Sequence, residues 1–300
     1  MPYDVSIISH ASLDITSDCI YLGGPASYCG KMLRNLKSNF FALVMVEKSF
    51  PFQNYYNENI KNYEFVYNRF TTTFLMKKIS GKRHLNILRR AQNFSIEVIP
   101  KKILNSKYIL LSPIVDDMPI KFVSALSNKT RAVICTDPFN NDNSRMNNKH
   151  LKYFNELMKY SQIIKMSENE IFGLFMTNNL NEAIEHLSRY RNTFLITLGS
   201  KGTLVYQKGI INEIIPSLKV YKPIDTTGCG DIFFSAFLYG LANSLTLKQS
   251  AILGNVCAGL SVISKGVDSV PSREEAFRHY SKIVHSKINT NTVLKFTNLI

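Results

Sequence analysis

The stretch DTTGCGD at 225–231, followed at once by IFFSAFLYGL at 232–241, is the most informative part of the sequence. Its glycines, Gly228 and Gly230, permit a tight turn whose N–H groups point in one direction. The apolar run predicts a buried helix over about 231–244, and the start of a helix carries partial positive charge. The stretch therefore predicts a site for an anion, and the anion we expect is a phosphate group in transfer.

Asp231 is the last residue of this turn. Its carboxylate is negatively charged, so it is a poor ligand for a phosphate. We interpret Asp231 as a general base that takes a proton from an attacking hydroxyl group. The alternative is an ordinary first-turn carboxylate that stabilises the helix start. Asp225, at the other end of the stretch, is interpreted as loop scaffolding. Two other nucleotide-binding motifs, GxxxxGK[ST] and a strand–GxGxxG–helix unit, do not occur in the sequence.

Length and composition set limits on the class of protein. The 300 residues are 45% hydrophobic, which is enough for a globular core, and the longest apolar runs are shorter than a membrane span. The five cysteines form no CxxC pair, which argues against a disulfide framework and a structural zinc site. With no basic start before the first apolar run, we expect a cytoplasmic protein that has no membrane partner.

The net charge of +14 fits either a nucleic-acid partner or an anionic small molecule. The basic residues are scattered, and no dense block of five or six of them occurs. We therefore expect no nucleic-acid partner, although charge alone leaves nucleic-acid binding as an alternative.

Short β-branched apolar runs alternate with amphipathic stretches along the chain. This alternation predicts an α/β fold with a mainly parallel sheet covered by helices on both faces. Beyond Thr203 we expect a strand pair and then two long helices, at about 231–244 and 247–264. The remaining predicted strands are 5–9, 41–46, 108–111, 132–136, 162–166 and 194–198, and the remaining predicted helices are 27–36, 120–127, 149–160 and 168–176.

Residues 64–99 interrupt this pattern with what we interpret as strands joined by a turn. An antiparallel insertion does not easily join a parallel sheet. We therefore predict a small β-sheet lid, formed from about 11–24 and 64–99, on a single domain that spans 1–300.

Several motifs together resemble the ribokinase-like (PfkB) carbohydrate kinases over nearly the whole chain. The resemblance implies a three-layer αβα fold and a carbohydrate kinase, a phosphotransferase with an alcohol group as acceptor. The lid strands further resemble a subgroup that includes archaeal inositol and nucleoside kinases. The motifs that carry the resemblance are GGPASYCGKMLRNL (23–36), TTTFLMKKISGKR (71–83), IKMSENE (164–170), TLGSKGTLVY (197–206), DTTGCGDIFFSAFLYGL (225–241) and GNVCAGLSVISKGVDSVPSREE (254–275).

The resemblance implies a role for particular residues. Asp231 is the catalytic base, and the amides of Gly228, Cys229 and Gly230 form the anion hole. Glu170 acts through water on Mg²⁺. Asp225 contributes to a monovalent-cation site for K⁺. Residues for ATP are Lys165, Thr197, Gly199, Lys201, Gly202, Asn255 and Ala258. Residues for the acceptor are Asp14 at the end of the first strand, Gly23, Gly24, Tyr28 and Arg83.

Two positions depart from the family pattern. Tyr28 stands where the family often has an asparagine that binds sugar, and an aromatic ring favours a different ligand face or a ring-stacked substrate. Ser167 replaces the asparagine of an Asn-x-x-Glu motif, although Glu170 remains.

The expected reaction is transfer of the γ-phosphate of ATP to a hydroxyl of a sugar, polyol or nucleoside. The alternative is a non-catalytic nucleotide- or sugar-binding regulator on the same fold. A homodimer through the free strand edge of the lid is also expected.

Overall fold

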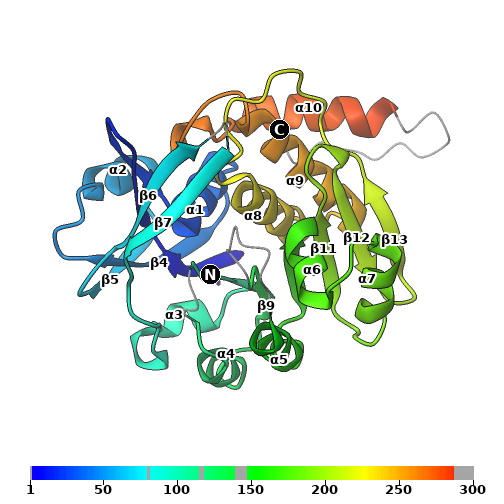
Figure 1. Ribbon diagram of the computed structural model, residues 1–300, viewed down its shortest axis with the longest axis horizontal. Coiled ribbons are helices and arrows are strands. Elements are labelled where there is room, and N and C mark those ends of the chain that lie inside the picture. Colours follow the sequence, from blue (N-terminus) through cyan, green and yellow to red (C-terminus); the bar gives the residue numbers. More distant parts are fainter. Residues whose placement is uncertain (1, 80–81, 115–117, 139–146, 287–300) are drawn as a thin grey trace.

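A nine-stranded sheet forms the centre of the computed structural model, which describes residues 2–79, 82–114, 118–138 and 147–286 (Figure 1). The strand order is β13-β12-β11-β10-β9-β8-β1-β4-β5, and every neighbouring pair is parallel except the two that involve β12. The strands are β1 (Val5–His10), β4 (Phe40–Glu47), β5 (Tyr63–Asn68), β8 (Tyr108–Ser112), β9 (Val133–Thr136), β10 (Ile163–Ser167), β11 (Thr193–Thr197), β12 (Thr203–Gln207) and β13 (Ile211–Ile215).

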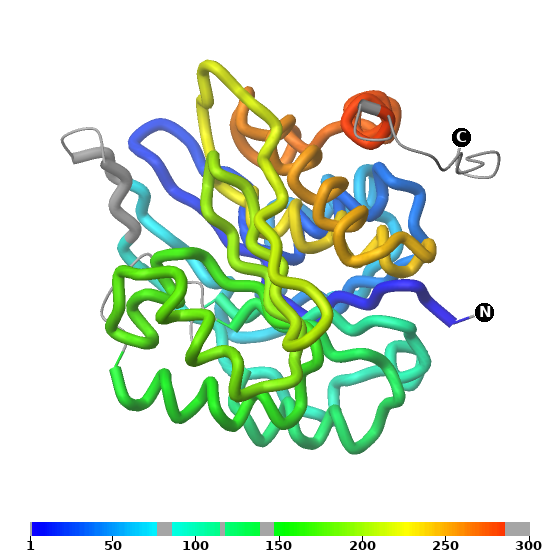
Figure 2. Tube along the Cα trace, turned by 90° about the vertical axis from the view of Figure 1, so that its right-hand side faces the viewer, coloured from blue at the N-terminus to red at the C-terminus, as the bar shows by residue number. Residues whose placement is uncertain are grey.

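Helices cover both faces of this sheet, so its inner strands are buried on both sides and their sequences are almost continuously apolar (Figures 1 and 2). One face packs against α1 (Pro25–Asn35), α2 (Gln53–Asn59), α8 (Cys229–Ala242), α9 (Leu247–Ser261) and α10 (Arg273–Ser286). The other packs against α3 (Lys101–Leu104), α4 (Ile120–Ser127), α5 (Asn148–Leu157), α6 (Glu168–Phe175) and α7 (Leu180–Leu187).

Strand β1 lies at the point where the strand order reverses. The chain adds β4 and β5 on one side of it and β8 to β11 on the other. In open parallel sheets, ligands bind outside the carboxyl ends of the strands at such a reversal. The topology therefore indicates a ligand site at the carboxyl edge of the sheet, near β1, β8, β9 and β10.

A second sheet of four strands, in the order β3-β2-β6-β7, forms the lid. Its strands are β2 (Ser12–Ile15), β3 (Ile20–Gly23), β6 (Thr72–Ile79) and β7 (Lys82–Arg89). The bounds expected from the sequence are partly wrong, because residues 64–68 belong to β5, which pairs in parallel with β4 in the large sheet. A parallel partner is available there because α2 provides the crossover between β4 and β5.

The predicted α/β class, the mainly parallel sheet and the small β-sheet lid are confirmed. The six predicted parallel strands all form, each within one residue of its expected bounds, and the expected strand pair forms from Thr203 onward as β12 and β13. Within the described residues, no helix combines the length and apolar character that crossing a membrane would need.

Candidate active site

The turn at 225–231 is held by its own polar groups and by α9. Oδ1 of Asp225 accepts hydrogen bonds from the amide (3.0 Å) and the hydroxyl (2.6 Å) of Thr227. The backbone N–H of Asp225 donates to the carbonyl of Val262, just beyond α9. Gly228 then caps α8 with a φ of 75°, a conformation that favours glycine. Asp225 thus has the scaffolding role expected of it.

Helix α8 is buried along most of its length, which fixes the position of the turn. Residues 232–240 are all buried, and the helix lies between α1 and α9 (Figure 1). From α1, the Cys29 thiol donates to the carbonyl of Asp231 at 3.4 Å. From α9, Gly254 lets Phe233 approach closely, since a Cβ at this glycine would stand 2.7 Å from the ring. The first turn of α8 is therefore positioned by neighbours on both sides.

Asp231 lies in the first turn of α8 in surroundings that favour its neutral form. Burial raises the pKa of Asp231 to about 7, with a further contribution from the negative charge of Asp137, while Lys165 opposes the rise. A carboxyl group that titrates near neutral pH is well matched to accept and release a proton. This property suits the role of general base that the sequence assigns to Asp231.

A buried ion pair lies beside this carboxylate. Nζ of Lys165, in β10, is 2.7 Å from Oδ2 of Asp137, which follows β9, and the two residues are only 7% and 6% exposed. Burial by itself lowers the pKa of the Lys165 ammonium. The carboxylates of Asp137, Glu170 and Asp231 outweigh that effect and raise the pKa above its usual range. Lys165 is therefore positively charged around neutral pH.

Asp137 was not identified from the sequence. The signal was present, because the residue directly follows a predicted strand and the carboxyl ends of parallel strands share one edge. Its neighbour in space, Lys165, was assigned to the nucleotide. In the structure, Lys165 lies against the turn, since a Cβ at Gly230 would stand 2.6 Å from its Nζ.

Glu170 forms a capping box with Ser167 at the start of α6. The Ser167 amide donates to Oε2 of Glu170 (2.6 Å), and the Glu170 amide donates to the Ser167 hydroxyl (3.3 Å). Burial raises the pKa of Glu170 to about 6, against the opposing charge of Lys165. Ser167 is thus an effective helix cap in the place of the asparagine, and it keeps Glu170 near the charged cluster.

On the acceptor side, Asp14 lies in lid strand β2 and not at the end of the first strand, which stops at His10. It is 6% exposed, and its Oδ1 accepts a hydrogen bond from Ser12 (2.9 Å). A Cβ at Gly23 would stand 2.6 Å from Oδ2 of Asp14. A Cβ at Gly24, whose φ is 84°, would stand 2.6 Å from the amide nitrogen of Ser12. The two glycines therefore allow β3 and α1 to pack directly on β2.

Tyr28 is 2% exposed in α1, and its ring packs against Gly228. The ring therefore forms a wall behind the turn and is not presented as a free stacking surface. Arg83 belongs to β7 and pairs with Lys78, but its side chain lies outside the described part of the structure.

Four of the residues expected to bind the nucleotide, Thr197, Gly199, Lys201 and Gly202, lie at the end of β11 and in the turn that leads into β12. Gly199 and Gly202 have φ of 59° and 111°, and a Cβ at Gly202 would stand 2.0 Å from the carbonyl oxygen of Ile215. Thr197 ends β11, and the exposed Lys201 is 3.4 Å from Glu168. Gly202 therefore lets the backbone before β12 pass close to the end of β13.

Asn255 and Ala258, both in α9, lie between that region and the catalytic turn. The Asn255 amide donates to the carbonyls of Ile215 (2.8 Å) and Pro216 (3.2 Å) and accepts from the Thr203 hydroxyl (2.8 Å). The carbonyl of Ala258 accepts from the Cys229 thiol at 3.8 Å. Asn255 therefore supports the strand ends, and contact with a nucleotide stays a prediction for both residues.

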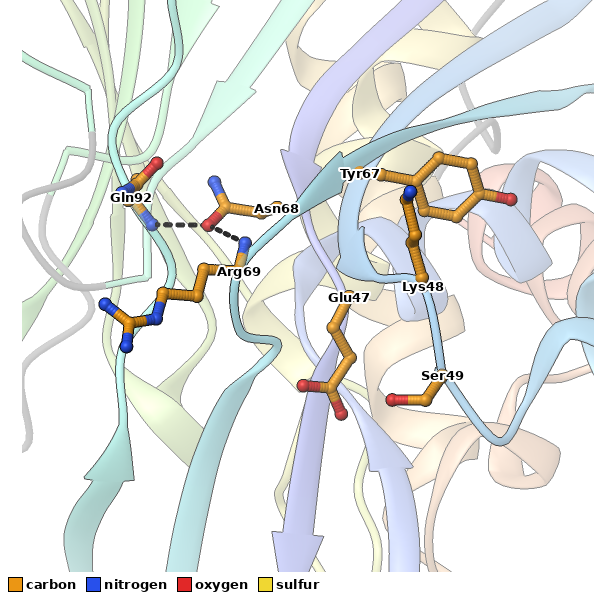
Figure 3. A pocket seen from close by; sticks show the side chains of 7 residues that line it. All are labelled: Glu47, Lys48, Ser49, Tyr67, Asn68, Arg69 and Gln92. Atoms are coloured by element: carbon orange, nitrogen blue, oxygen red, sulfur yellow. Dashed lines mark hydrogen bonds between the residues drawn. The ribbon is translucent and has the colours of Figure 1, made fainter.

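A separate pocket of about 480 Å³ opens where the lid joins β4 and β5 (Figure 3). In Figure 3, Arg69 and Gln92 border one side, and Lys48, Ser49 and Tyr67 border the other. Most of this lining is exposed, and it contains none of the residues predicted for the site. The candidate site is therefore the turn before α8, and this pocket is separate from it.

Comparisons with known proteins identify the family of this chain. The model of the pfkB family of carbohydrate kinases matches residues 68–274. The ribokinase of Lactococcus lactis is 36% identical over 107 residues, which are 36% of this chain and 34% of the relative. The matched segments of the first curated relatives span about a third to two fifths of those proteins' lengths.

Solved structures match the fold over almost the whole chain. Arabidopsis thaliana ribokinase, in complex with ribose and ATP, has a TM-score of 0.75 at 16% identity and covers 93% of this chain and 99% of its own. A Vibrio cholerae fructokinase double mutant, with fructose, ADP and potassium bound, has a TM-score of 0.78 at 18% identity, with the same coverage.

Proposed function

The chain belongs to the pfkB family of carbohydrate kinases, and we propose that it transfers the γ-phosphate of ATP to a hydroxyl group of a sugar, polyol or nucleoside. The observation that carries the proposal is Asp231 in the first turn of α8, next to the glycine turn and titrating near neutral pH. Family membership supports the same reaction class.

In the proposed reaction, Asp231 accepts the proton of the acceptor hydroxyl. The hydroxyl oxygen forms a bond to the γ-phosphorus as the bond from that phosphorus to the bridging oxygen breaks, and ADP leaves with the electron pair. The N–H groups of Gly228 and Gly230 and the positive end of α8 stabilise the charge on the transferring group. Cys229 contributes less, because its amide already donates to Thr226 at 3.3 Å.

Magnesium bound to the nucleotide would neutralise phosphate charge in this site. In the described part of the chain, no group of three or more His, Cys, Asp or Glu side chains is placed to hold a metal ion. That fits Mg²⁺, which keeps several waters and binds mainly through phosphates. Glu170, which is partly buried beside the cluster, is the residue we propose to act on it through water.

Asp225 is our proposed contributor to a monovalent-cation site. Its Oδ1 is already shared between two groups of Thr227, so it would act mainly by shaping the loop. A potassium dependence of activity, compared between K⁺ and Na⁺ at equal ionic strength, tests this assignment.

The acceptor would lie between the lid and the carboxyl end of β1, where Asp14 is held by Ser12. Asp14 would accept hydrogen bonds from acceptor hydroxyls, and closure of the lid would exclude water from the reaction. Tyr28 would limit the depth of the site on the side of α1.

An acceptor panel tests the proposed function. Hexoses, pentoses, polyols such as inositol, and nucleosides are each incubated with the protein, ATP and Mg²⁺, and ADP release is measured. We expect one class to release ADP well above the rate without acceptor, and Asp231→Asn to abolish that gain. ATP binding with no phosphate transfer to any class would instead favour the regulator.

Two further proposals concern the setting of the protein. The lid ends in the edge strands β3 and β7, with Ile20, Ile87 and Leu88 about half exposed, so we propose a homodimer through this sheet. Light scattering of the wild type and of Ile87→Lys tests it. The five free cysteines fit a reducing, cytoplasmic compartment.

A further inference from the structure

The ion pair of Asp137 and Lys165 is deeply buried. Both side chains are less than a tenth exposed and their charged atoms are 2.7 Å apart. Removing two charges from water costs several kcal/mol per ion, which their attraction only partly offsets. A buried ion pair is therefore weak evidence for a contribution to stability. The position of this pair in the structure says more about its role.

The position of the ammonium is fixed against the catalytic turn. A Cβ at Gly230 would stand 2.6 Å from Nζ and 3.2 Å from Cε of Lys165, so only glycine leaves room for this approach. Gly230 directly precedes Asp231 in the first turn of α8. The positive charge thus lies at the helix start where the phosphate is expected.

Three carboxylates share this one cation. Asp137 follows β9, Glu170 comes from α6 and Asp231 from α8, and each interacts electrostatically with Lys165. Among the described residues, the thiols of Cys29 and Cys229 also interact electrostatically with Asp231, and burial raises the pKa of both. Oδ1 of Asp137 is buried and has no hydrogen-bond partner among the described residues. Lys165 is therefore the group that compensates its charge.

We propose that Asp137 and Lys165 are positioning residues that act on Asp231 in opposite directions: the Lys165 ammonium, paired with Asp137 and packed against Gly230, favours the ionised Asp231 carboxylate beside the phosphate, and the Asp137 carboxylate opposes it. The catalytic part of this inference rests on the proposed function, in which Asp231 is the base. The electrostatic part does not, because it concerns the ionisation of Asp231 in the free protein.

The test is a titration of Asp231 by NMR in protein labelled with ¹³C at the aspartate carboxyl groups. The resonance is assigned by its loss in Asp231→Asn. Asp137→Asn removes a negative neighbour and leaves Lys165 uncompensated, so the midpoint falls by about one pH unit, a tenfold change in the ratio of ionised to neutral Asp231. Lys165→Met removes the positive neighbour, so the midpoint rises above that of the wild type.

Matched controls come from an exposed ion pair of the same length, Lys248 with Glu213 at 2.7 Å. Lys248→Met and Glu213→Gln change the net charge equally and are expected to leave the midpoint of Asp231 in place. Circular dichroism confirms folding, and Asp137→Asn alone decides the result if Lys165→Met does not fold. Midpoints within about 0.3 pH unit of the wild type, or shifts of the same sign in both single variants, overturn the proposal.

Activity separates this inference from the proposed function. The acidic limb of the pH profile of kcat/KM moves with the NMR midpoint if Asp231 is the base. If the two variants shift the NMR midpoint of Asp231 in opposite directions but the protein phosphorylates no acceptor, the electrostatic role stands and the proposed kinase activity is rejected. An active enzyme with a fixed acidic limb in both variants would reject the positioning role in catalysis.

Discussion

The ring of Tyr28 packs directly on the backbone of Gly228, with no room for a methyl group between them. A Cβ at Gly228 would stand 2.4 Å from Cδ1 of the ring. The contact joins α1 to the residue that caps α8, so Tyr28 and the turn that we propose to bind phosphate are one packed unit.

Gly228→Ala is therefore expected to lose most activity and to destabilise the fold by about 1–3 kcal/mol, from overpacking against the ring and from the positive φ. Thermal unfolding and the phosphotransfer rate measure both effects. Gly209→Ala is the matched control, because this glycine has a φ of 74° and nothing within 4 Å of the added Cβ. Equal losses of stability in the two variants would mean that Tyr28 does not constrain the turn.

Asp231→Asn is expected to fold normally and to reduce kcat by about 10²–10⁴, the usual contribution of a general base. The amide keeps the shape of the side chain but cannot accept the hydroxyl proton in the same way. Nucleotide affinity, measured by calorimetry, should change little. Turnover close to that of the wild type would remove Asp231 from the role of base.

The pH profile of kcat/KM is expected to fall on the acid side with an apparent pKa of about 7, because protonated Asp231 is not a base. Stability changes with pH in the opposite direction to that expected for a carboxylate in an ion pair. The pKa of Asp231 is higher in the folded state than in the unfolded chain, so its contribution to stability is lost as the pH rises from about 4 to about 7.

Asp231→Asn should accordingly raise the melting temperature relative to the wild type at pH 8, and the difference should shrink towards pH 4. Differential scanning calorimetry at the two pH values gives the comparison. A difference that is constant with pH would show that the carboxyl group is not desolvated in the fold.

Asn255→Ala is expected to cost about 2–4 kcal/mol of stability, because it leaves the carbonyls of Ile215 and Pro216 and the Thr203 hydroxyl without their shared partner. The strand ends around Gly202 lose their support, so the KM for ATP should rise as well. Thr203→Val, which removes one of the three bonds, should have a smaller effect on both. If Asn255→Ala raises the KM with unchanged stability, the side chain contacts the nucleotide directly.

Ser167→Ala should destabilise the protein by about 1 kcal/mol through loss of the α6 cap, whereas Ser167→Asn should retain stability because asparagine caps helices as well as serine does. Chemical denaturation measures both variants. A clear loss in Ser167→Asn would show that the site requires serine for a reason other than capping.

The sequence predicts best those features that depend on residues close together in the chain. The turn of Gly228 and Gly230, the following helix and the six parallel strands are local patterns, and each is present. The contact between Asp137 and Lys165 depends on the order and register of two strands, which no local pattern contains. For the same reason β5 was assigned to the lid, because an apolar run does not specify which strand it pairs with.

The burial of Tyr28 shows the same limit at the level of a single side chain. Its place in the motif indicates a substrate residue, but the direction of its ring is decided by Gly228, two hundred positions later in the chain. The aromatic residue type suggested that Tyr28 offers a surface for stacking, whereas its packing against Gly228 makes the ring a wall of the site.

Some of the partners that position the turn before α8 lie far away in the chain. The Cys29 thiol meets the Asp231 carbonyl across 202 positions, and α8 lies between α1, near the start of the chain, and α9, which follows it. Contacts of such long range form late in folding. A nascent chain on the ribosome therefore carries the lid, Asp137 and Lys165 long before it acquires Asp231, the proposed base, so we expect chains that stop short of α8 to lack phosphotransfer activity.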